Sequence, residues 1–481
     1  MLLRAKNIQK EYGVQEILKI SDLQIDEGDR IALIGRNGVG KSTLMKALLG
    51  EIECDSGNIS RNTEIAYISQ DGVVEDDVLV SGKYISRFGL KESPAMSGGE
   101  KTKMAIGAAF SKRASILFAD EPTTNLDVKA IEELEQMLNN YHGAILLISH
   151  DRQLINNVCN TIWELEDGNI RTFSGNYDEW MVQKHREFDY QMDEYDKYRA
   201  EKKRLEKMAS DIDSEGTSGK KKKRMSNSEA KMYKGFAASK QGQMKKRKSS
   251  IQSRLNHLEE KEKPRELPHI SMKVSDYNRI RSKTAARVSG YSFAYENHEV
   301  LSDLNLDILA GKKTFIIGNN GCGKTTLLNA IVHQKDGIHI SSEAKIGYFS
   351  QNHDVLEWDK DVISNVVSTA VVPEHICRAV LNNLYLSKLD MTKKVNVLSG
   401  GERTKVAIAK LLVSGCNFLI MDEPTNHLDI YTMESLERLL KDFDGTLLIV
   451  THDRKFVHNL ADYVYTMENK TVSCTQTNVE Y

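Results

Sequence analysis

Two glycine-rich segments have the residue types and spacing of a phosphate-binding loop. One reads Gly-Arg-Asn-Gly-Val-Gly-Lys-Ser over residues 35–42, and the other reads Gly-Asn-Asn-Gly-Cys-Gly-Lys-Thr over residues 318–325. Each follows a short β-rich apolar run and precedes a run typical of a helix, which is the context that a P-loop requires. The glycines let backbone N–H groups approach phosphate oxygens, and the helix N-terminus adds partial positive charge. The chain is therefore predicted to hold two nucleoside triphosphates.

Single side chains in these loops have separate expected roles. Lys41 and Lys324 are expected to reach the β- and γ-phosphates, while Ser42 and Thr325 are expected to bind Mg²⁺. We therefore expect ATP and Mg²⁺ as cofactors. The other expected ATP contacts in the two loops are Gly35, Asn37, Gly38, Gly40, Thr43, Gly318, Asn320, Gly321, Gly323 and Thr326.

Two carboxylates end an apolar run in each half of the chain, at residues 116–122 and 418–424. Buried carboxylates are costly unless they bind a partner. The first acid, Asp120 or Asp422, can hold Mg²⁺, and the second, Glu121 or Glu423, can polarise an attacking water. In the alternative interpretation, these acids only cap the following helix.

A Ser-Gly-Gly-Glu sequence precedes an alanine-rich helical run in each half. Two glycines at a helix start leave backbone N–H groups accessible to an anion. The expected ATP contacts here are Ser97, Gly98, Gly99, Ser399, Gly400 and Gly401.

A glutamine and a histidine also recur at the ends of apolar runs. Gln70 and Gln351 are predicted to contact the metal and the water, because each follows a strand-like run at a similar distance from its P-loop. His150 and His452, each 29 residues after its glutamate, are predicted to sense the γ-phosphate and to take part in catalysis. Either histidine alone is equally consistent with a structural residue at a strand end.

These elements recur in the same order, so the chain contains one domain twice. The P-loop lysines lie 283 positions apart, whereas the signature serines, glutamates and histidines lie 302 apart. The second copy thus has a longer segment between Gln351 and Ser399 than the first has between Gln70 and Ser97. We predict an α/β fold with two tandem P-loop ATPase domains, residues 1–180 and 266–481, joined by a linker over residues 181–265.

The linker is strongly basic. Residues 181–265 carry 24 Lys and Arg against 14 Asp and Glu, although the whole chain has a net charge of −2. Its flanks keep a 3.5-residue apolar spacing, with residues 216–235 between them, which predicts two antiparallel helices and a basic tip. The spaced residues are Met181, Phe188, Tyr195, Tyr198, Leu205, Met208 and Ile212 in the first flank and Met244, Ile251, Leu255 and Leu258 in the second. Such a charge density requires a polyanion, most often a phosphate backbone. In the alternative interpretation, the segment is a solvated linker. The expected RNA contacts are Lys220, Lys221, Lys222, Lys223, Arg224, Lys231, Tyr233, Lys234, Phe236, Lys245, Lys246 and Arg247.

Composition excludes several other classes of protein. No apolar run is long enough to span a membrane, and the N-terminus does not resemble a signal peptide. The six cysteines are scattered and form no CxxC pair, so neither a zinc site nor a disulfide framework is expected. A reducing cytoplasm fits these features.

Together these residues resemble the ATP-binding-cassette superfamily over residues 1–180 and 280–481. Two cassettes, a charged helical linker and no membrane segment resemble its F subfamily, the ribosome-binding ABC proteins. The short first insert, Ser228-Glu229-Ala230-Lys231 and the linker exit Arg265-Glu266-Leu267-Pro268 resemble the Vga-type antibiotic-resistance members.

The resemblance implies that Tyr12 and Tyr295 stack on adenine. It also implies that ATP lies between the P-loop of one cassette and the Ser-Gly-Gly loop of the other, pairing Lys41 with Ser399 and Lys324 with Ser97. A monomer with intramolecular pairing of its cassettes is expected. The implied partner is the large ribosomal subunit, with rRNA at the E site and the peptidyl-transferase region and with tRNA. The implied activity is protection from pleuromutilins, lincosamides and streptogramin A.

Other functions stay open at this point. A housekeeping translation factor of the same subfamily, the ATPase subunit of an exporter and a nucleic-acid repair ATPase share many of these residues. One departure also predicts unequal sites, because Thr123-Thr124-Asn125 in the first copy replaces the Thr425-Asn426-His427 of the second.

Overall fold

The computed structural model describes residues 1–13, 15–72, 80–82, 97–217, 227–264, 279–295 and 298–476. The chain forms two compact units, one made of Met1–Trp180 with Pro268–Tyr481 and the other of Met181–Leu267. Most of the short insert expected between Gln70 and Ser97 lies outside the described residues, as do Lys220–Lys223 and Arg224.

The first unit contains the same six-stranded sheet twice. The strand orders are β5-β6-β7-β3-β8-β9 and β14-β15-β16-β12-β17-β18, and in each sheet only the last strand is antiparallel to its neighbour. The first sheet consists of β3 (Arg30–Ile34), β5 (Ile65–Ile68), β6 (Ile116–Asp120), β7 (Ala144–Ile148), β8 (Thr161–Glu166) and β9 (Asn169–Ser174). The second consists of β12 (Lys313–Gly318), β14 (Ile346–Phe349), β15 (Phe418–Asp422), β16 (Thr446–Val450), β17 (Tyr463–Glu468) and β18 (Thr471–Gln476). The predicted pair of α/β domains is confirmed.

A three-stranded antiparallel sheet accompanies each large sheet. The strands are β1 (Leu3–Tyr12), β2 (Gln15–Ile25) and β4 (Ser56–Arg61) in the first copy, and β10 (Thr284–Tyr295), β11 (His298–Leu309) and β13 (Ile338–Ile340) in the second. In the first copy, one buried cluster joins Leu3 and Leu18 of this sheet to Leu44 of the helix after the P-loop and to Phe118 of β6. An equivalent cluster joins Leu301, Leu327 and Phe418. This shared core fixes each P-loop against its large sheet.

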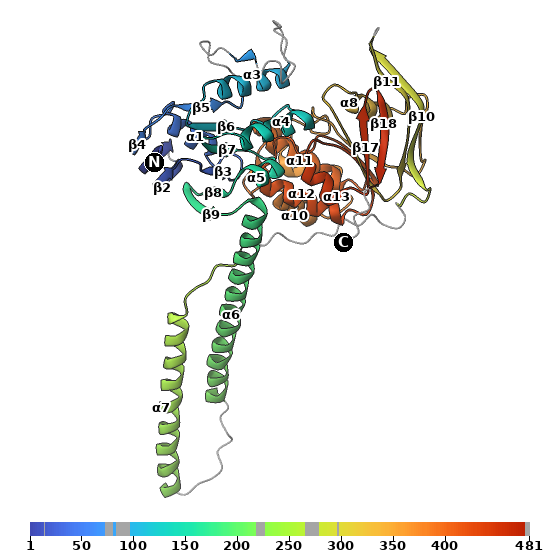
Figure 1. The fold of residues 1–481 in the computed structure, drawn as a ribbon. Helices are drawn as coiled ribbons and strands as arrows, with labels where there is room; N and C mark the ends of the chain where they lie inside the picture. The colour runs from blue at the N-terminus through green and yellow to red at the C-terminus, as the bar shows by residue number, and fades with distance from the viewer. Residues whose placement is uncertain are drawn as a thin grey trace. The chain divides into compact units, whose positions relative to one another are not determined.

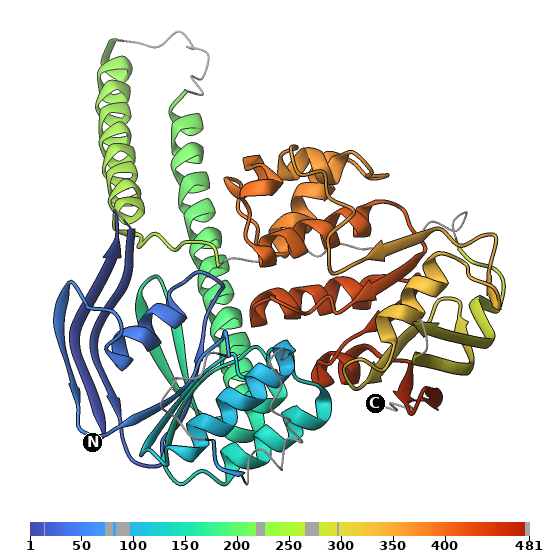
Figure 2. The ribbon, with the colours of Figure 1, turned by 90° about the horizontal axis from the view of Figure 1, so that it is seen from above.

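Helices cover the sheets and begin at the functional loops (Figures 1 and 2). They are α1 (Lys41–Leu49), α3 (Gly98–Ser111), α4 (Val128–Asn139) and α5 (Arg152–Val158) in the first copy, and α8 (Lys324–Val332), α9 (Val362–Val367), α10 (Glu374–Asn383), α11 (Gly400–Val413), α12 (Ile430–Asp442) and α13 (Arg454–Leu460) in the second. The longer segment of the second copy folds into α9, α10 and two 3₁₀ turns, η2 (Asp390–Thr392) and η3 (Val395–Val397). No helix in the described part of the chain has both the length and the apolar content needed to cross a bilayer.

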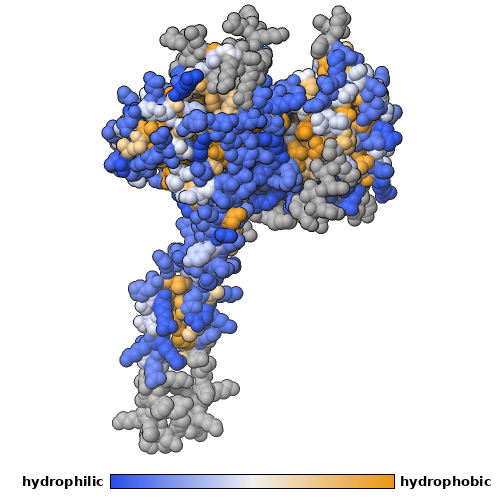
Figure 3. All heavy atoms as spheres, in the orientation of Figure 1, coloured by the Kyte–Doolittle hydropathy of each residue, from blue (hydrophilic) through white to orange (hydrophobic). Residues whose placement is uncertain are grey.

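Two long helices make up most of the second unit. α6 (Tyr177–Thr217) and α7 (Asn227–His257) lie side by side and run in opposite directions (Figures 1 and 2). Leu205 and Ile251 are almost completely buried, and apolar residues gather along the middle of the pair (Figure 3). Met208, which the apolar spacing placed with them, is 45% exposed.

The two helices extend into the interval 216–235 that was expected to separate them, because α6 ends at Thr217 and α7 begins at Asn227. α7 already begins at Asn227, so Lys231, Tyr233, Lys234 and Phe236 lie in its first turns, although the placement of their side chains lies outside the description. Ala, Lys and Met are good helix formers, and together they outweigh the ~1 kcal/mol that a glycine such as Gly235 costs inside a helix.

Replacing Leu205 by Ala should loosen the helix pair. A large apolar side chain that is 2% exposed leaves a cavity when truncated, which typically costs about 2–5 kcal/mol. Amide hydrogen exchange measured by mass spectrometry should therefore become faster in α6 and α7, with the cassettes unchanged. Met208→Ala is the matched control and should leave exchange near the wild-type rate; equal effects of the two changes would contradict this packing.

Candidate functional site

Each P-loop passes directly from a buried strand into a helix. Gly38 and Gly40 have φ values of 78° and 107°, and Gly321 and Gly323 have 76° and 99°, which is the left-handed region that glycine adopts without strain. A Cβ on Gly40 would lie 2.5 Å from Ile17, and one on Gly323 would lie 2.6 Å from Leu301. All four glycines thus suit the turn, and Gly40 and Gly323 are also required for close packing against β2 and β11.

The two P-loop lysines are buried and bound to their own loops. Lys41 Nζ donates to the carbonyls of Gly35 at 2.8 Å and Arg36 at 3.0 Å. Lys324 Nζ donates to Gly318 at 2.9 Å and Asn319 at 3.0 Å. These bonds hold each ammonium inside the loop, where the predicted β- and γ-phosphate contacts require it.

The paired carboxylates lie at the ends of β6 and β15, as the sequence predicts. Glu121 and Glu423 both have φ of 49°, a conformation that is uncommon outside glycine. Such a residue costs about 1–3 kcal/mol and persists only where its surroundings impose it. Here the neighbouring strand does so, because Glu121 N donates to Ile148 O at 2.8 Å and Glu423 N to Val450 O at 2.9 Å.

The residues expected to bind Mg²⁺ fit such an ion. Asp120 is 2% exposed and Asp422 1% exposed, and Asp120 Oδ1 and both carboxylate oxygens of Asp422 are buried without a hydrogen-bond donor. Burial raises the pKa of both aspartates overall, although the hydroxyls of Ser42 and Thr325 act in the opposite direction. No cluster of three or more His, Cys, Asp or Glu suited to a metal occurs among the described residues. A hydroxyl and a carboxylate with unused oxygens suit Mg²⁺ held together with substrate phosphates.

A histidine contacts the second carboxylate in each copy. His150 Nε2 lies 3.1 Å from Glu121 Oε1, and its backbone N–H donates to Glu121 Oε2 at 3.2 Å. His452 and Glu423 make the same two contacts, both at 3.2 Å. The sequence placed each histidine at a strand end, and the structure brings each of them to its glutamate.

Burial sets the protonation of these pairs. It raises the pKa of Glu121 and of Glu423 to about 7, although Lys41 and Lys324 respectively act in the opposite direction. It lowers the pKa of His150 to about 3 and that of His452 to about 4. The histidines are therefore neutral at pH 7, and each glutamate is poised between its two states, which suits a group that polarises water.

The Ser-Gly-Gly loops form the starts of α3 and α11. Ser97 and Ser399 are the N-caps, and each forms a reciprocal capping box with Glu100 or Glu402. The first intrahelical bonds come only from Lys101 and Arg403, so the N–H groups of the intervening glycines lie ahead of them. This is the arrangement that an anion can bind.

The two copies meet through their P-loops. Asn37 Nδ2 donates to His427 O at 2.8 Å, and Asn320 Nδ2 donates to Asn125 O at 2.9 Å. A Cβ on Gly401 would lie 3.4 Å from Asn37 Nδ2, so the start of α11 is adjacent to the first P-loop. The structure thus brings the Lys41 loop close to the Ser399 loop, as the resemblance implied.

The surroundings of the two P-loops differ. Beside the first, Asn37 N donates to Asp429 Oδ2 at 3.3 Å, while no equivalent bond joins Asn320 to Asp127 in the described residues. Tyr431 donates to Glu164, whereas Lys129, 302 positions earlier, pairs in an exposed site with Glu468 at 3.2 Å. Exposed pairs contribute little to stability. The interface between the copies is therefore more buried beside the first P-loop than beside the second.

The Asn125 and His427 difference lies beside equivalent backbone contacts. Both residues have φ of 63°, and each offers its backbone carbonyl to the opposite P-loop. After burial, His427 is among the groups that lower the pKa of His150, whereas the uncharged Asn125 has no such effect on His452. The unequal sites that this departure suggested stay a prediction.

The remaining predicted residues lie at the surface. Gln70 and Gln351 are exposed just after β5 and β14. Tyr12 and Tyr295 are 52% and 59% exposed at the ends of β1 and β10, open for an adenine to stack. Lys245, Lys246 and Arg247 are exposed on α7. Their predicted binding roles stay predictions.

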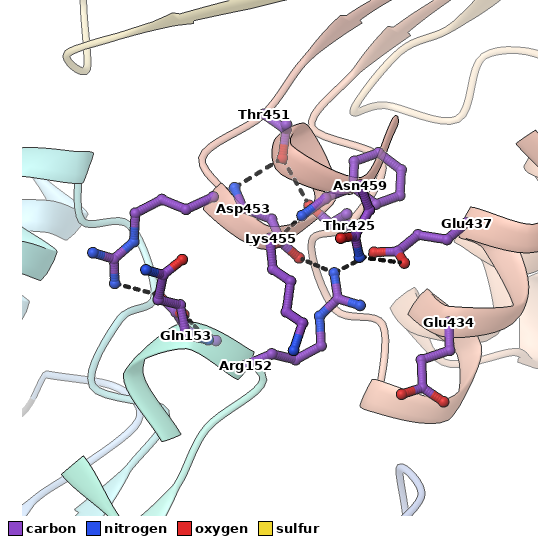
Figure 4. Close-up of polar contacts among 12 residues, drawn as sticks. Arg152, Gln153, Thr425, Glu434, Glu437, Thr451, Asp453, Lys455 and Asn459 are labelled. Carbon is purple, nitrogen blue, oxygen red and sulfur yellow. Dashed lines mark hydrogen bonds and ion pairs between the residues drawn. The ribbon is translucent and has the colours of Figure 1, made fainter. Parts of the chain in front are cut away.

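The sequence analysis does not identify a set of charged and amide side chains between the copies. It comprises Glu135, Asp151, Arg152 and Asn157 in the first copy and Glu437, Asp453, Arg454 and Asn459 in the second, again 302 positions apart. Arg152 forms ion pairs with Glu437 and Asp453 of the opposite copy (Figure 4). Arg454 forms ion pairs with the first copy in the same way. Their shared offset is a signal that could have identified them.

Known proteins combine the same features. The ABC transporter family matches residues 18–124 and 301–426. The erythromycin resistance ATP-binding protein MsrA of Staphylococcus epidermidis is 33% identical over 95% of both chains. The ribosome protection protein VmlR of Bacillus subtilis is 30% identical over 96% of this chain and 86% of its own.

The chain belongs to the ABC-F group of ATP-binding-cassette proteins. Its cassettes bind and hydrolyse ATP. The tandem arrangement also matches a solved structure, the RNase-L inhibitor, with a TM-score of 0.66 at 18% identity over 98% of this chain and 90% of that one. That likeness concerns the fold.

The stability of the nucleotide-free ABC-F protein should depend on pH through its two glutamates. Unfolded glutamate ionises above the ordinary pKa of 4.5, whereas folded Glu121 and Glu423 keep their protons up to about 7. Folding therefore binds protons in this window, and this contribution to stability falls as pH rises. Glu121→Gln with Glu423→Gln removes the dependence.

The Tm of this double variant should exceed that of the wild type by about 3 °C or more at pH ~8, with a smaller difference at pH ~5.5, measured by scanning calorimetry. Glu11→Gln with Glu132→Gln, both exposed, is the control. A Tm difference that is the same at both pH values would show that the glutamates are not held in this way.

Proposed function

We propose that this ATPase binds the ribosome when ATP closes its cassettes and leaves when ATP is hydrolysed. The observation that carries the proposal is the reciprocal pairing of Asn37 and Asn320 with the carbonyls of His427 and Asn125. Neither P-loop alone neutralises a triphosphate, so the opposite Ser-Gly-Gly loop completes each site. ATP then holds the copies together, and hydrolysis removes the bridging phosphate.

The proposed chemistry follows from the geometry of each site. Ser42 and Asp120, or Thr325 and Asp422, would hold Mg²⁺ together with Gln70 or Gln351, and the ion would supply positive charge to the phosphates. Glu121 and Glu423 polarise the attacking water, and the strand ends hold them in place. His150 and His452, neutral at pH 7, position the carboxylates and contact the γ-phosphate.

The linker is proposed to contact rRNA. Its excess of basic residues supports binding to a phosphate backbone through counterion release. Lys245, Lys246 and Arg247 are exposed, as phosphate contacts need to be. Tyr233 and Phe236 are proposed to stack on unpaired bases beyond them, as aromatic residues commonly do with RNA.

The biological role proposed is protection of the ribosome from antibiotics at the peptidyl-transferase centre. Support comes from relatives whose names state ribosome protection and erythromycin resistance. We propose binding near the E site, with the linker tip reaching toward pleuromutilin, lincosamide and streptogramin A sites and contacting tRNA. A monomer in the cytoplasm performs this cycle without a membrane partner.

Glu121→Gln with Glu423→Gln should hold the protein on ribosomes. Gln keeps the shape of the site but cannot act as a base, so ATP stays bound and the closed form persists. Sedimentation through sucrose with ATP should retain at least ~10-fold more of this variant than of wild type. The retained fraction should decrease steeply as salt is raised.

Lys41→Ala with Lys324→Ala, which weakens ATP binding, is the matched control and should not sediment. If the Glu121→Gln and Glu423→Gln variant left ribosomes as fast as the wild type does, the proposed cycle would be refuted. Recovery in washed membranes with no ribosomal fraction would instead favour an exporter subunit.

Deleting residues 228–238 should abolish drug protection while leaving ATP hydrolysis within ~2-fold of wild type. The deletion removes 11 residues, about three turns of α7, which keeps the face of the remaining helix nearly in register. Growth of a sensitive host with tiamulin, lincomycin, virginiamycin M or erythromycin measures protection. Tyr233→Ala with Phe236→Ala is the milder companion.

Loss of hydrolysis together with protection would contradict a separate function of the tip. Full-length protein that gives no resistance to any of the four drugs, but still sediments with ribosomes, would favour a housekeeping translation factor of the same group.

A further inference from the structure

Eight residues form a crossed ion-pair cluster where the two copies meet. They are Glu135, Asp151, Arg152 and Asn157 and their equivalents Glu437, Asp453, Arg454 and Asn459. None of them belongs to the predicted nucleotide contacts. Each arginine starts a helix, α5 or α13, two residues after the histidine of its own copy.

Arg152 crosses into the second copy and is 1% exposed. Its Nη2 bonds to Glu437 Oε1 and lies 3.2 Å from Asp453 Oδ2 (Figure 4). The other oxygen of Glu437 accepts from Asn459 at 3.0 Å, so the carboxylate is fixed by its own copy. Arg152 therefore meets acceptors that are already held in position.

Arg454 repeats this arrangement in the opposite direction. Its Nη2 lies 2.9 Å from Glu135 Oε2 and 3.8 Å from Asp151 Oδ2. Asn157 donates to the other oxygen of Glu135 at 2.8 Å. Arg454 is more exposed than Arg152, with 20% of its side chain accessible, and its second contact is longer. The second half of the cluster is therefore the weaker one.

Hydrogen bonds connect the cluster to the loops that carry both glutamates. Asp453 N donates to Thr451 Oγ1 at 3.1 Å, and Thr451 bonds to Thr425, two residues after Glu423, at 3.1 Å. In the first copy, Asp151 N donates to Ser149 Oγ at 3.0 Å, and Ser149 lies 3.5 Å from Thr123. The aspartate that each arginine contacts thus belongs to the loop that carries His452 or His150.

Separating the copies breaks the ion pairs of Arg152 and Arg454 together. A buried arginine that loses its carboxylate partners becomes an uncompensated charge and destabilises the protein. A buried carboxylate that loses its arginine does the same. Since each guanidinium is attached to one histidine loop and bound to the other, a shift of either loop changes the contacts of its counterpart.

We propose that Arg152 and Arg454 are positioning residues that make hydrolysis at one nucleotide site depend on the state of the other. This inference rests on the proposed catalytic role of Glu121 and Glu423. Arg152 contributes more to the dependence than Arg454, because its contacts are shorter and more buried.

The test compares the effect of Glu423→Gln on ATP hydrolysis in several backgrounds. In the wild type, inactivating one of two coupled sites should lower the total rate by about 5-fold or more, which is the range of typical coupling. With Arg152→Met and Arg454→Met, the sites act separately, and Glu423→Gln should lower the remaining rate by only about 2-fold.

Three matched variants separate coupling from general damage. Arg454→Lys keeps the charge and should keep most of the coupling, whereas Arg454→Met should lose part of it. Lys129→Met breaks the exposed Lys129–Glu468 pair, which also joins the copies but not the histidine loops, and should leave coupling unchanged. If Arg152→Met does not fold, Glu437→Gln removes the same charge pair and keeps an acceptor for Asn459.

A wild-type loss of only about 2-fold on Glu423→Gln would overturn the proposal. So would unchanged coupling in the Arg152→Met and Arg454→Met background, or a Lys129→Met variant that loses coupling equally. Hydrolysis that persists in the Glu121→Gln and Glu423→Gln double variant would instead refute the catalytic assignment, independently of the arginines.

Discussion

Negative charge buried at the ends of apolar strands is the constraint from which this structure follows. Asp120, Glu121, Asp422 and Glu423 lie at the ends of β6 and β15, where burial raises their pKa values and leaves several oxygens without donors. The P-loop lysines act electrostatically on the two glutamates, but they bond to loop carbonyls. A nucleotide with its metal can neutralise these carboxylates, so the site is arranged around a ligand that the protein alone cannot replace.

The need to neutralise this charge also explains why the domain occurs twice. Each P-loop reaches carbonyl groups of the opposite copy, and each histidine loop is joined by an arginine to its counterpart. The two copies nevertheless differ, because Tyr431 donates to the buried Glu164 where the equivalent Lys129 makes an exposed ion pair. Reciprocal contacts with unequal burial allow the two sites to respond to each other without being identical.

The linker shows which structural features the charge and the apolar spacing of a sequence can predict. The basic excess and the apolar repeat predicted a helical segment, and α6 and α7 are long helices with Leu205 and Ile251 buried. The helix ends did not follow from the spacing, since good helix formers continue α7 back to Asn227 through Gly235. The exposure of Met208 could not be predicted either, because a 3.5-residue spacing defines a stripe but not which of its members face the other helix.

The sequence by itself determined the local chemistry: two P-loops, two pairs of strand-end carboxylates, two Ser-Gly-Gly helix starts and two histidines in repeated order. These depend on short-range rules of glycine conformation, helix capping and strand burial. Only the tertiary structure decided which copy each loop meets, that Asn125 and His427 offer backbone carbonyls to the opposite P-loops, and that Arg152 and Arg454 cross between the copies. Long-range pairing of charges depends on how two surfaces approach in three dimensions, and no local pattern in the chain encodes that approach.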